Sequence, residues 1–241
     1  MKFIQHYSGS SGNLYEVIAS NGKKLMIECG VSWAKVLNAF DYKLGLIEGC
    51  FMSHEHKDHS KSALEVMKAG IDLYASTGTL KALFIMKRRA FNLEEHDLIR
   101  TESFDILTFG VNHDAEQPLG FVVREKSTNE FLLFATDTSH LVQKFPYPFS
   151  IIAIEASYDK DVLKRKVESG EINESLAKRL LTSHMEIQET MRYIQNFCCL
   201  EKCHELHLLH MSGRNSDHAK ARKLFEDRFF IDVRTVNDVS I

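Results

Sequence analysis

Four potential metal ligands lie within six residues of the segment 53–60, which reads SHEHKDHS. Imidazole nitrogens and carboxylates suit zinc and related divalent ions. In an extended segment His54 and His56 point the same way and can hold one ion, whereas Asp58 and His59 follow after a turn and can face a second ion. A charged surface turn that happens to be rich in histidine is the plainer alternative, but three histidines and an aspartate at this spacing favour a metal centre.

The motif follows the apolar run 44–52, LGLIEGCFM, which predicts a buried strand. The ligands therefore lie where a strand ends and a loop begins. Active sites of layered α/β folds gather at such strand ends.

The pattern His-x-His-x-Asp-His closely resembles the signature of the metallo-β-lactamase superfamily. This resemblance implies an α/β fold, a four-layer αβ/βα sandwich, in a single domain over residues 1–241. It also implies a two-metal site along the sheet edges, completed by a later histidine, a bridging aspartate and a last histidine, each at a strand end.

Residues that match these three positions follow in the expected order. His113 precedes a Pro-x-Gly-Phe segment, the apolar run 131–135 leads to Asp137, and the alternating run 206–209 leads to His210. The resemblance assigns the first ion to His54, His56 and His113, the second to Asp58, His59 and His210, and Asp137 to both. A carboxylate suits the shared position because an anionic oxygen offsets the repulsion between two cations. We expect two divalent ions, with zinc as the first choice and manganese as the alternative.

Two further residues lie beside this ligand set. Glu28 occupies a place where the superfamily usually has an aspartate that buttresses the metal loop, and its longer side chain either does the same work with a shifted backbone or loosens the support. Ser183-x-x-Glu186 predicts a capping box that opens a helix over 186–197. His184 is then either an exposed first-turn residue or a proton donor or substrate contact, because a similar histidine occurs in the YycJ (WalJ) branch of the superfamily.

Other segments also resemble the YycJ-like branch. The loop 8–13, SGSSGN, has backbone amides that could contact a phosphate. A flexible turn is its alternative reading. The segment 210–215, HMSGRN, also resembles that branch. From the loop and this segment we predict substrate contacts at Ser11, Asn13, Ser212 and Asn215.

Composition limits the kinds of partner. The net charge of −3 does not suggest an avid nucleic-acid binder, although a local basic groove is compatible with it. We expect no membrane segment, because no run is long and apolar enough. The five cysteines include no Cys-x-x-Cys pair and predict a reduced, cytoplasmic setting. The group Cys198, Cys199 and Cys203 reads as packing at a helix end.

Helical patterns are expected over 31–40, 62–69 and 79–91. Apolar residues of the last segment could support a homodimer. Its basic stretch 87–89 is either a solvated face or a contact for a polyanion.

Two metals held together suit the hydrolysis of negatively charged oxygen esters. Asp58 would bind the second ion and orient the nucleophilic water. The expected activity is phosphodiester hydrolysis on a nucleotide or nucleic acid. A phosphodiesterase specific for small 3′,5′-cyclic nucleotides is the alternative, because the superfamily includes phage enzymes that destroy cyclic-nucleotide defence signals. Thioester or lactone hydrolysis ranks lower.

Overall fold

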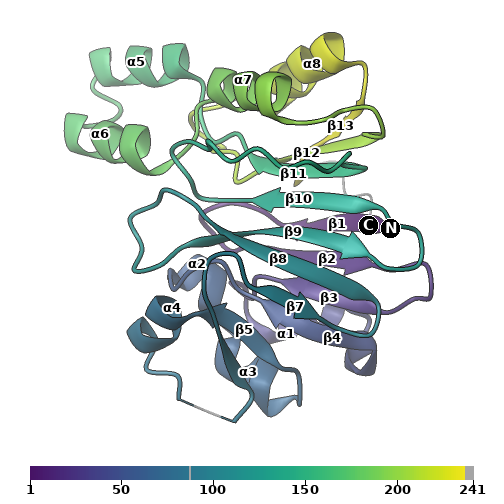
Figure 1. The fold of residues 1–241 in the computed structure, drawn as a ribbon. Helices are drawn as coiled ribbons and strands as arrows, with labels where there is room; N and C mark the ends of the chain where they lie inside the picture. Colours follow the sequence, from purple (N-terminus) through teal and green to yellow (C-terminus); the bar gives the residue numbers. More distant parts are fainter. Residues whose placement is uncertain (87, 237–241) are drawn as a thin grey trace. The chain divides into compact units, whose positions relative to one another are not determined.

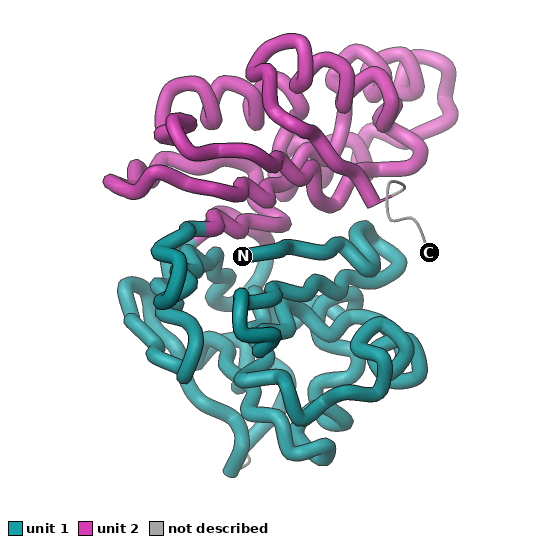
Figure 2. Tube along the Cα trace, turned by 90° about the vertical axis from the view of Figure 1, so that its right-hand side faces the viewer, with its two compact units in different colours: residues 1–110, 115–131, 239–241 teal, residues 111–114, 132–238 magenta. Residues whose placement is uncertain are grey.

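A computed structural model describes residues 1–86 and 88–236 of the chain. The Cα trace divides into two compact units, coloured separately in Figure 2. Unit 1 comprises residues 1–110 and 115–131, and unit 2 comprises residues 111–114 and 132–236, within the described part of the chain. The single domain over residues 1–241 stays a prediction.

The apolar and alternating runs at the start of unit 1 form a six-stranded sheet (Figure 1). Its strands, in order, are β1 (Lys2–Tyr7), β2 (Leu14–Ile18), β3 (Lys24–Ile27), β4 (Ile47–Phe51), β5 (Leu73–Ser76) and β6 (Ala90–Leu93). The first three strands are antiparallel and the rest are parallel. The turn between β2 and β3 contains Gly22 at φ 82°, as the Asn-Gly pair at this position predicts.

Helices of unit 1 pack against this sheet through one apolar cluster. They are α1 (Trp33–Ala39), α3 (Ala63–Lys68) and α4 (Thr77–Ala82). Val36, Val66 and Leu80 bring one residue of each helix into the cluster, together with Met26 and Cys50 from the strands. Short helical turns η1 (Leu44–Leu46) and α2 (Lys57–Ser60) flank β4. The helices pack on one face of the sheet, and the loops at the carboxyl ends of β3 and β4 carry the ligand motif.

Unit 1 also contains three antiparallel strands, β7 (Leu98–Arg100), β8 (Phe104–Gly110) and β9 (Leu119–Glu125). Alternate residues of β8, including Phe104 and Ile106, are buried.

Unit 2 is built on parallel strands β10 (Phe131–Ala135), β11 (Ile151–Glu155), β12 (Glu205–Leu209) and β13 (Asp232–Arg234). β11 is buried along its whole length, as expected for a parallel strand that is covered on both faces. The helices α5 (Lys160–Glu168), α6 (Glu174–Ser183), α7 (Ile187–Phe197) and α8 (His218–Phe229) complete the unit (Figure 1). No helix in the described residues has the length and hydropathy that a membrane crossing requires.

The predicted helix over 79–91 is wrong. The helix α4 ends at Ala82, and Phe84 takes a left-handed backbone at φ 54°. Residues 90–93 then pair with β5 as the parallel strand β6, so ladder formation outweighs the local helical pattern. Of the basic stretch, Arg89 binds Asp72 at 2.6 Å, whereas Lys87 lies outside the described residues.

The homodimer stays a prediction, with exposed apolar residues of the same segment 79–91 as its surface. Phe84 is 92% exposed and Met86 is 96% exposed on the segment after α4. If these side chains form an interface, light scattering at working concentration should give twice the chain mass of 27.6 kDa. A monomer mass would exclude the dimer. Phe84→Ser should lower the mass, whereas Phe230→Ser, at an equally exposed position in unit 2, should not.

The helix predicted over 186–197 is confirmed as α7, but the predicted capping box is wrong. Ser183 ends α6, and Glu186 is itself the N-cap of α7, where its carboxylate accepts from the Glu189 amide. His184 therefore follows the end of α6 and is not a first-turn residue. Asp217 caps α8. The strand β13 ends at Arg234, and residues 237–241 lie outside the described part of the chain.

Candidate metal centre

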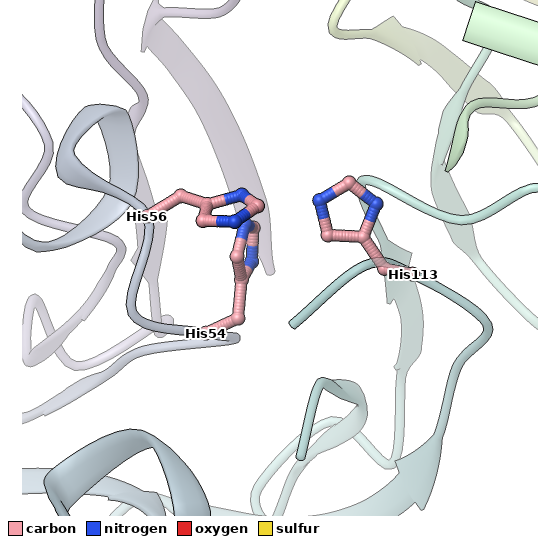
Figure 3. A group of neighbouring side chains, drawn as sticks. All are labelled: His54, His56 and His113. Carbon is pink, nitrogen blue, oxygen red and sulfur yellow. The ribbon is translucent and has the colours of Figure 1, made fainter. Parts of the chain in front are cut away.

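The loop after β4 presents two histidine rings together. His54 is 1% exposed, and its ring centroid lies 4.7 Å from that of His56, with the two planes at 79°. Ser53 Oγ lies 2.8 Å from His54 Nδ1 and orients this buried ring. Figure 3 draws the pair, together with His113, the third histidine predicted for the same ion. The loop thus brings together the two side chains that the sequence assigned to one ion.

Asp58 and His59 follow on the one-turn helix α2. The amides of His59 and Ser60 both donate to the carbonyl of His56, at 2.8 and 3.0 Å, and so close this turn. The His59 ring is fully buried, whereas the Asp58 carboxylate keeps a quarter of its surface exposed. The turn expected between the two halves of the motif is confirmed, and the His59 ring packs on that of His54, with centroids 4.1 Å apart.

Glu28 lies behind this loop, directly after β3. It is fully buried and takes a left-handed backbone at φ 62°. Its carboxylate accepts from the Ser53 amide at 3.2 Å and lies 3.5 Å from His59 Nδ1. Glu28 therefore contacts the loop at two points and supports it from behind.

The strand ends of unit 2 show the same backbone feature at Asp137 and His210. Asp137 follows β10 at φ 43°, and His210 follows β12 at φ 50°. Non-glycine residues rarely adopt this conformation, and where they do they often lie at functional sites. Both side chains are buried, and Asp137 Oδ1 lies 3.6 Å from His210 Nδ1.

His113 is oriented by a main-chain carbonyl. Its Nδ1 lies 2.8 Å from the carbonyl oxygen of Ser183, which can only accept, so Nδ1 carries the proton. Burial lowers the pKa of His113, and the neutral ring therefore presents an unprotonated Nε2. This nitrogen lies 3.7 Å from Asp137 Oδ2. A neutral imidazole whose other nitrogen donates to a carbonyl is the usual form of a metal-binding histidine.

Glu155 was not among the predicted site residues, although it ends β11 beside them. It is fully buried, and one carboxylate oxygen accepts from the amides of Thr138 and Met185, at 2.7 and 3.2 Å. The other oxygen lies 2.7 Å from His184 Nδ1. Burial alone would raise the pKa of Glu155, but the His184 ring and these hydrogen bonds hold it below its usual value. A Glu-Ala pair at the end of an apolar strand was the only signal in the sequence.

His184 is correspondingly poised to carry a proton. Burial alone would lower the pKa of His184, but the Glu155 carboxylate more than offsets burial and raises it. Because Nδ1 donates to Glu155, the second proton of the charged ring lies on Nε2. The ring stacks on His210 with centroids 5.1 Å apart and planes at 14°. His184 therefore lies beside a predicted ligand with a proton available for transfer.

Four side chains of unit 2 converge closely enough to surround a cation. One possible ligand atom each of Asp137, Glu155, His184 and His210 lies within 4.8 Å of the others. Glu155 also accepts from two amides and a histidine, so it orients its neighbours as well as offering a possible ligand atom. In the described residues, no such group includes a cysteine, and the packing role of the cysteine cluster stays a prediction.

The four predicted substrate contacts lie in different environments. Ser11 is exposed on the loop before β2, whereas Asn13 is fully buried and bonded within the protein. Ser212 is half-buried, and its Oγ accepts from the amide of Asn215, which is 6% exposed. Substrate contact at these positions stays a prediction.

Comparison with known proteins agrees with this architecture. Residues 12–99 match the family model described as Anti-Pycsar protein Apyc1. No curated protein matches the sequence. Among solved structures, the chain is similar to the metallo-β-lactamase fold protein YhfI from Bacillus subtilis, with a TM-score of 0.74 and 14% identity over 97% of this chain and 95% of that one.

Two further solved structures are similar. Igni18, a metallo hydrolase from Ignicoccus hospitalis, has a TM-score of 0.68 and 14% identity over 97% of this chain and 95% of that one. The short form of human tRNase Z has a TM-score of 0.64 and 18% identity over 89% and 93%. The protein therefore has the metallo-β-lactamase fold, and the predicted mixed α/β class is confirmed. The closer resemblance to the YycJ-like branch stays a prediction.

Proposed function

We propose that the protein is a metal-dependent hydrolase that cleaves phosphodiester bonds of a nucleotide or nucleic acid. The observation that carries this proposal is the Glu155–His184 pair, a carboxylate that raises the pKa of a histidine beside Asp137 and His210. Phosphodiester cleavage expels an alkoxide, which needs a proton from such an acid. The similarity to a tRNase and to a metallo hydrolase supports the same class.

The donor set fits two divalent ions. We propose that one is held by His54, His56 and His113, the second by Asp58, His59 and His210, and that Asp137 binds both. The unprotonated Nε2 of His113 and the buried carboxylate of Asp137 are suitable donors. When bound, the ions would supply a nucleophile at neutral pH and positive charge to stabilise the transition state. Zinc suits this donor set, with manganese as the alternative.

The protein's own residues would then divide the remaining work. Asp58 helps to orient the attacking group, and His184 protonates the leaving oxygen through Nε2. Glu155 holds the His184 ring in the required tautomer, as carboxylates do for catalytic histidines. We place this chemistry in the cytoplasm, as the cysteine content suggested.

A phosphodiesterase specific for small 3′,5′-cyclic nucleotides is the second candidate. The match of residues 12–99 to the Anti-Pycsar Apyc1 family favours this substrate class. The net charge of −3 also suits a small substrate better than a long polyanion.

One parallel assay tests the proposal and separates these candidates. The metal-loaded protein is incubated with bis-p-nitrophenyl phosphate, linear DNA, RNA, 3′,5′-cyclic nucleotides, a thioester and a lactone. We expect cleavage of the phosphodiesters. Preference for cyclic nucleotides over DNA and RNA would select the second candidate, and cleavage of only the thioester or lactone would overturn the proposal.

Metal content gives an independent prediction. Elemental analysis after gentle purification and reloading should find two divalent ions per chain. His210→Asn should remove one of them, because a ligand of the second ion is lost. His207→Asn is the matched control on the strand that precedes His210, since His207 is buried against Glu205 and is not a predicted ligand. Trace metal in the wild-type protein, or equal losses in both variants, would contradict the two-ion site.

A further inference from the structure

The loop 8–13 lies against the metal-binding turn of unit 1, and Asn13 makes the contact. The Asn13 amide donates to the carbonyl oxygen of Asp58 at 2.8 Å. Its side-chain Nδ2 donates to the same oxygen at 3.1 Å and lies 3.0 Å from His59 Nε2. One residue thus contacts both ligands that the short helix α2 supplies.

The side chain of Asn13 is itself fixed in orientation. Its Oδ1 accepts from the Gly9 amide at 2.9 Å and from the Tyr15 hydroxyl at 3.0 Å. Because Oδ1 meets two donors, the NH₂ group must face Asp58 and His59. Asn13 is fully buried, so these contacts are shielded from water.

Two glycines allow the three segments to approach this closely. A Cβ on Gly30 would lie 1.6 Å from the carbonyl oxygen of Asp58, and the Gly30 amide donates to the carbonyl of Asn13 at 2.9 Å. Gly12 has φ 143°, and a Cβ there would lie 2.7 Å from Val31 Cγ1. The packing therefore leaves no space for a substrate group between Asn13 and Asp58.

We infer that Asn13 is a positioning residue for the second metal ion, acting through Asp58 and His59, and not a substrate contact. Glu28 lies 3.5 Å from the Nδ1 of the same His59 ring, which leaves Nε2, the atom beside Asn13, as the nitrogen that can bind the ion. The two-ion site on which this inference rests is the one proposed above. Residues that orient metal ligands typically contribute about 10–100-fold to metal affinity.

The test compares Asn13→Ala and Asn13→Asp with the wild-type protein by titration with Co²⁺ and competition with a chelator. The first equivalent should bind nearly as in the wild type, because Asn13 contacts Asp58 and His59, which are assigned to the second ion. The second should bind about 10–100-fold more weakly in Asn13→Ala, with an altered visible spectrum. Asn13→Asp should bind it more weakly still, since a carboxylate oxygen would face the Asp58 carbonyl.

Thr108→Val is the matched control for lost stability. Thr108 is also fully buried in unit 1, and its hydroxyl donates to the main-chain carbonyl of Glu94 and accepts from the amide of Asp97, outside the metal loop. It should lower the melting temperature without changing Co²⁺ affinity. If Asn13→Ala fails to fold, Asn13→Ser serves in its place.

The outcomes separate this inference from the proposed function. If the wild-type protein does not bind two ions, both the proposed function and the positioning role of Asn13 are wrong. A wild-type protein with two ions, whose Asn13 variants keep the same affinity and spectrum, would overturn the positioning role alone. Equal weakening of both ions would also overturn it, because that result marks a general loss of structure. A change confined to KM, with metal affinity unchanged, would instead indicate that Asn13 contacts the substrate.

Discussion

Asp58→Ala should abolish phosphodiester cleavage while the protein remains folded. The substitution removes a carboxylate from the predicted ligand set, and misplacing reacting groups by about 1 Å can cost about a hundredfold in rate. The fold should survive because the Asp58 side chain is a quarter exposed and its loss opens no apolar cavity. The carbonyl that Asn13 binds is also retained in alanine. Initial rates on bis-p-nitrophenyl phosphate and a natural nucleotide ester measure the effect.

Lys57→Ala is the control for this experiment. Lys57 belongs to the same helical turn, but its side chain is exposed and it is not a predicted ligand. It should keep wild-type activity and the wild-type melting temperature. Full activity in Asp58→Ala would defeat the two-metal mechanism itself.

The parts of the site that the sequence predicted share one property: they belong to contiguous motifs at strand ends. His54 and His56 lie together on their loop because an extended segment turns alternate side chains to the same face. Asp137 and His210 follow apolar runs that form parallel strands, so their strand ends could be read from hydropathy alone.

Other features depend on contacts between distant segments and could not be predicted in this way. Residues 90–93 form a strand because β5 offers a pairing edge, which the helical pattern of 79–91 does not reveal. Ser183 precedes Glu186 at the spacing of a capping box, yet α6 continues to Ser183. Asn13 and Asp58 are 45 residues apart, so their bond has no local signature.

Glu155 illustrates the same limit within the site. The residue type and the strand end were visible in the sequence, but its function depends on three partners from two other segments, Thr138, His184 and Met185. These contacts fix the carboxylate as an orienting group, while one of its oxygens also lies among the possible metal ligands.

The choice of leaving group should reveal the role of His184. If its Nε2 protonates the leaving oxygen, His184→Ala should slow cleavage of a natural nucleotide ester by roughly 10²–10⁴-fold. The loss should be much smaller for bis-p-nitrophenyl phosphate, because p-nitrophenolate leaves readily without a proton. Rates for both substrates, measured on the same metal-loaded preparations, give the comparison.

The control must separate proton transfer from damage to the ligands, because the His184 ring stacks on His210. His184→Ala should therefore still bind two ions by elemental analysis before its rates are interpreted. His207→Ala, which removes a buried histidine from the strand that precedes His210, should leave the ratio of the two rates unchanged. Equal losses on both substrates in His184→Ala would rule out the acid role, since only protonation of the leaving group makes the loss depend on how readily that group departs.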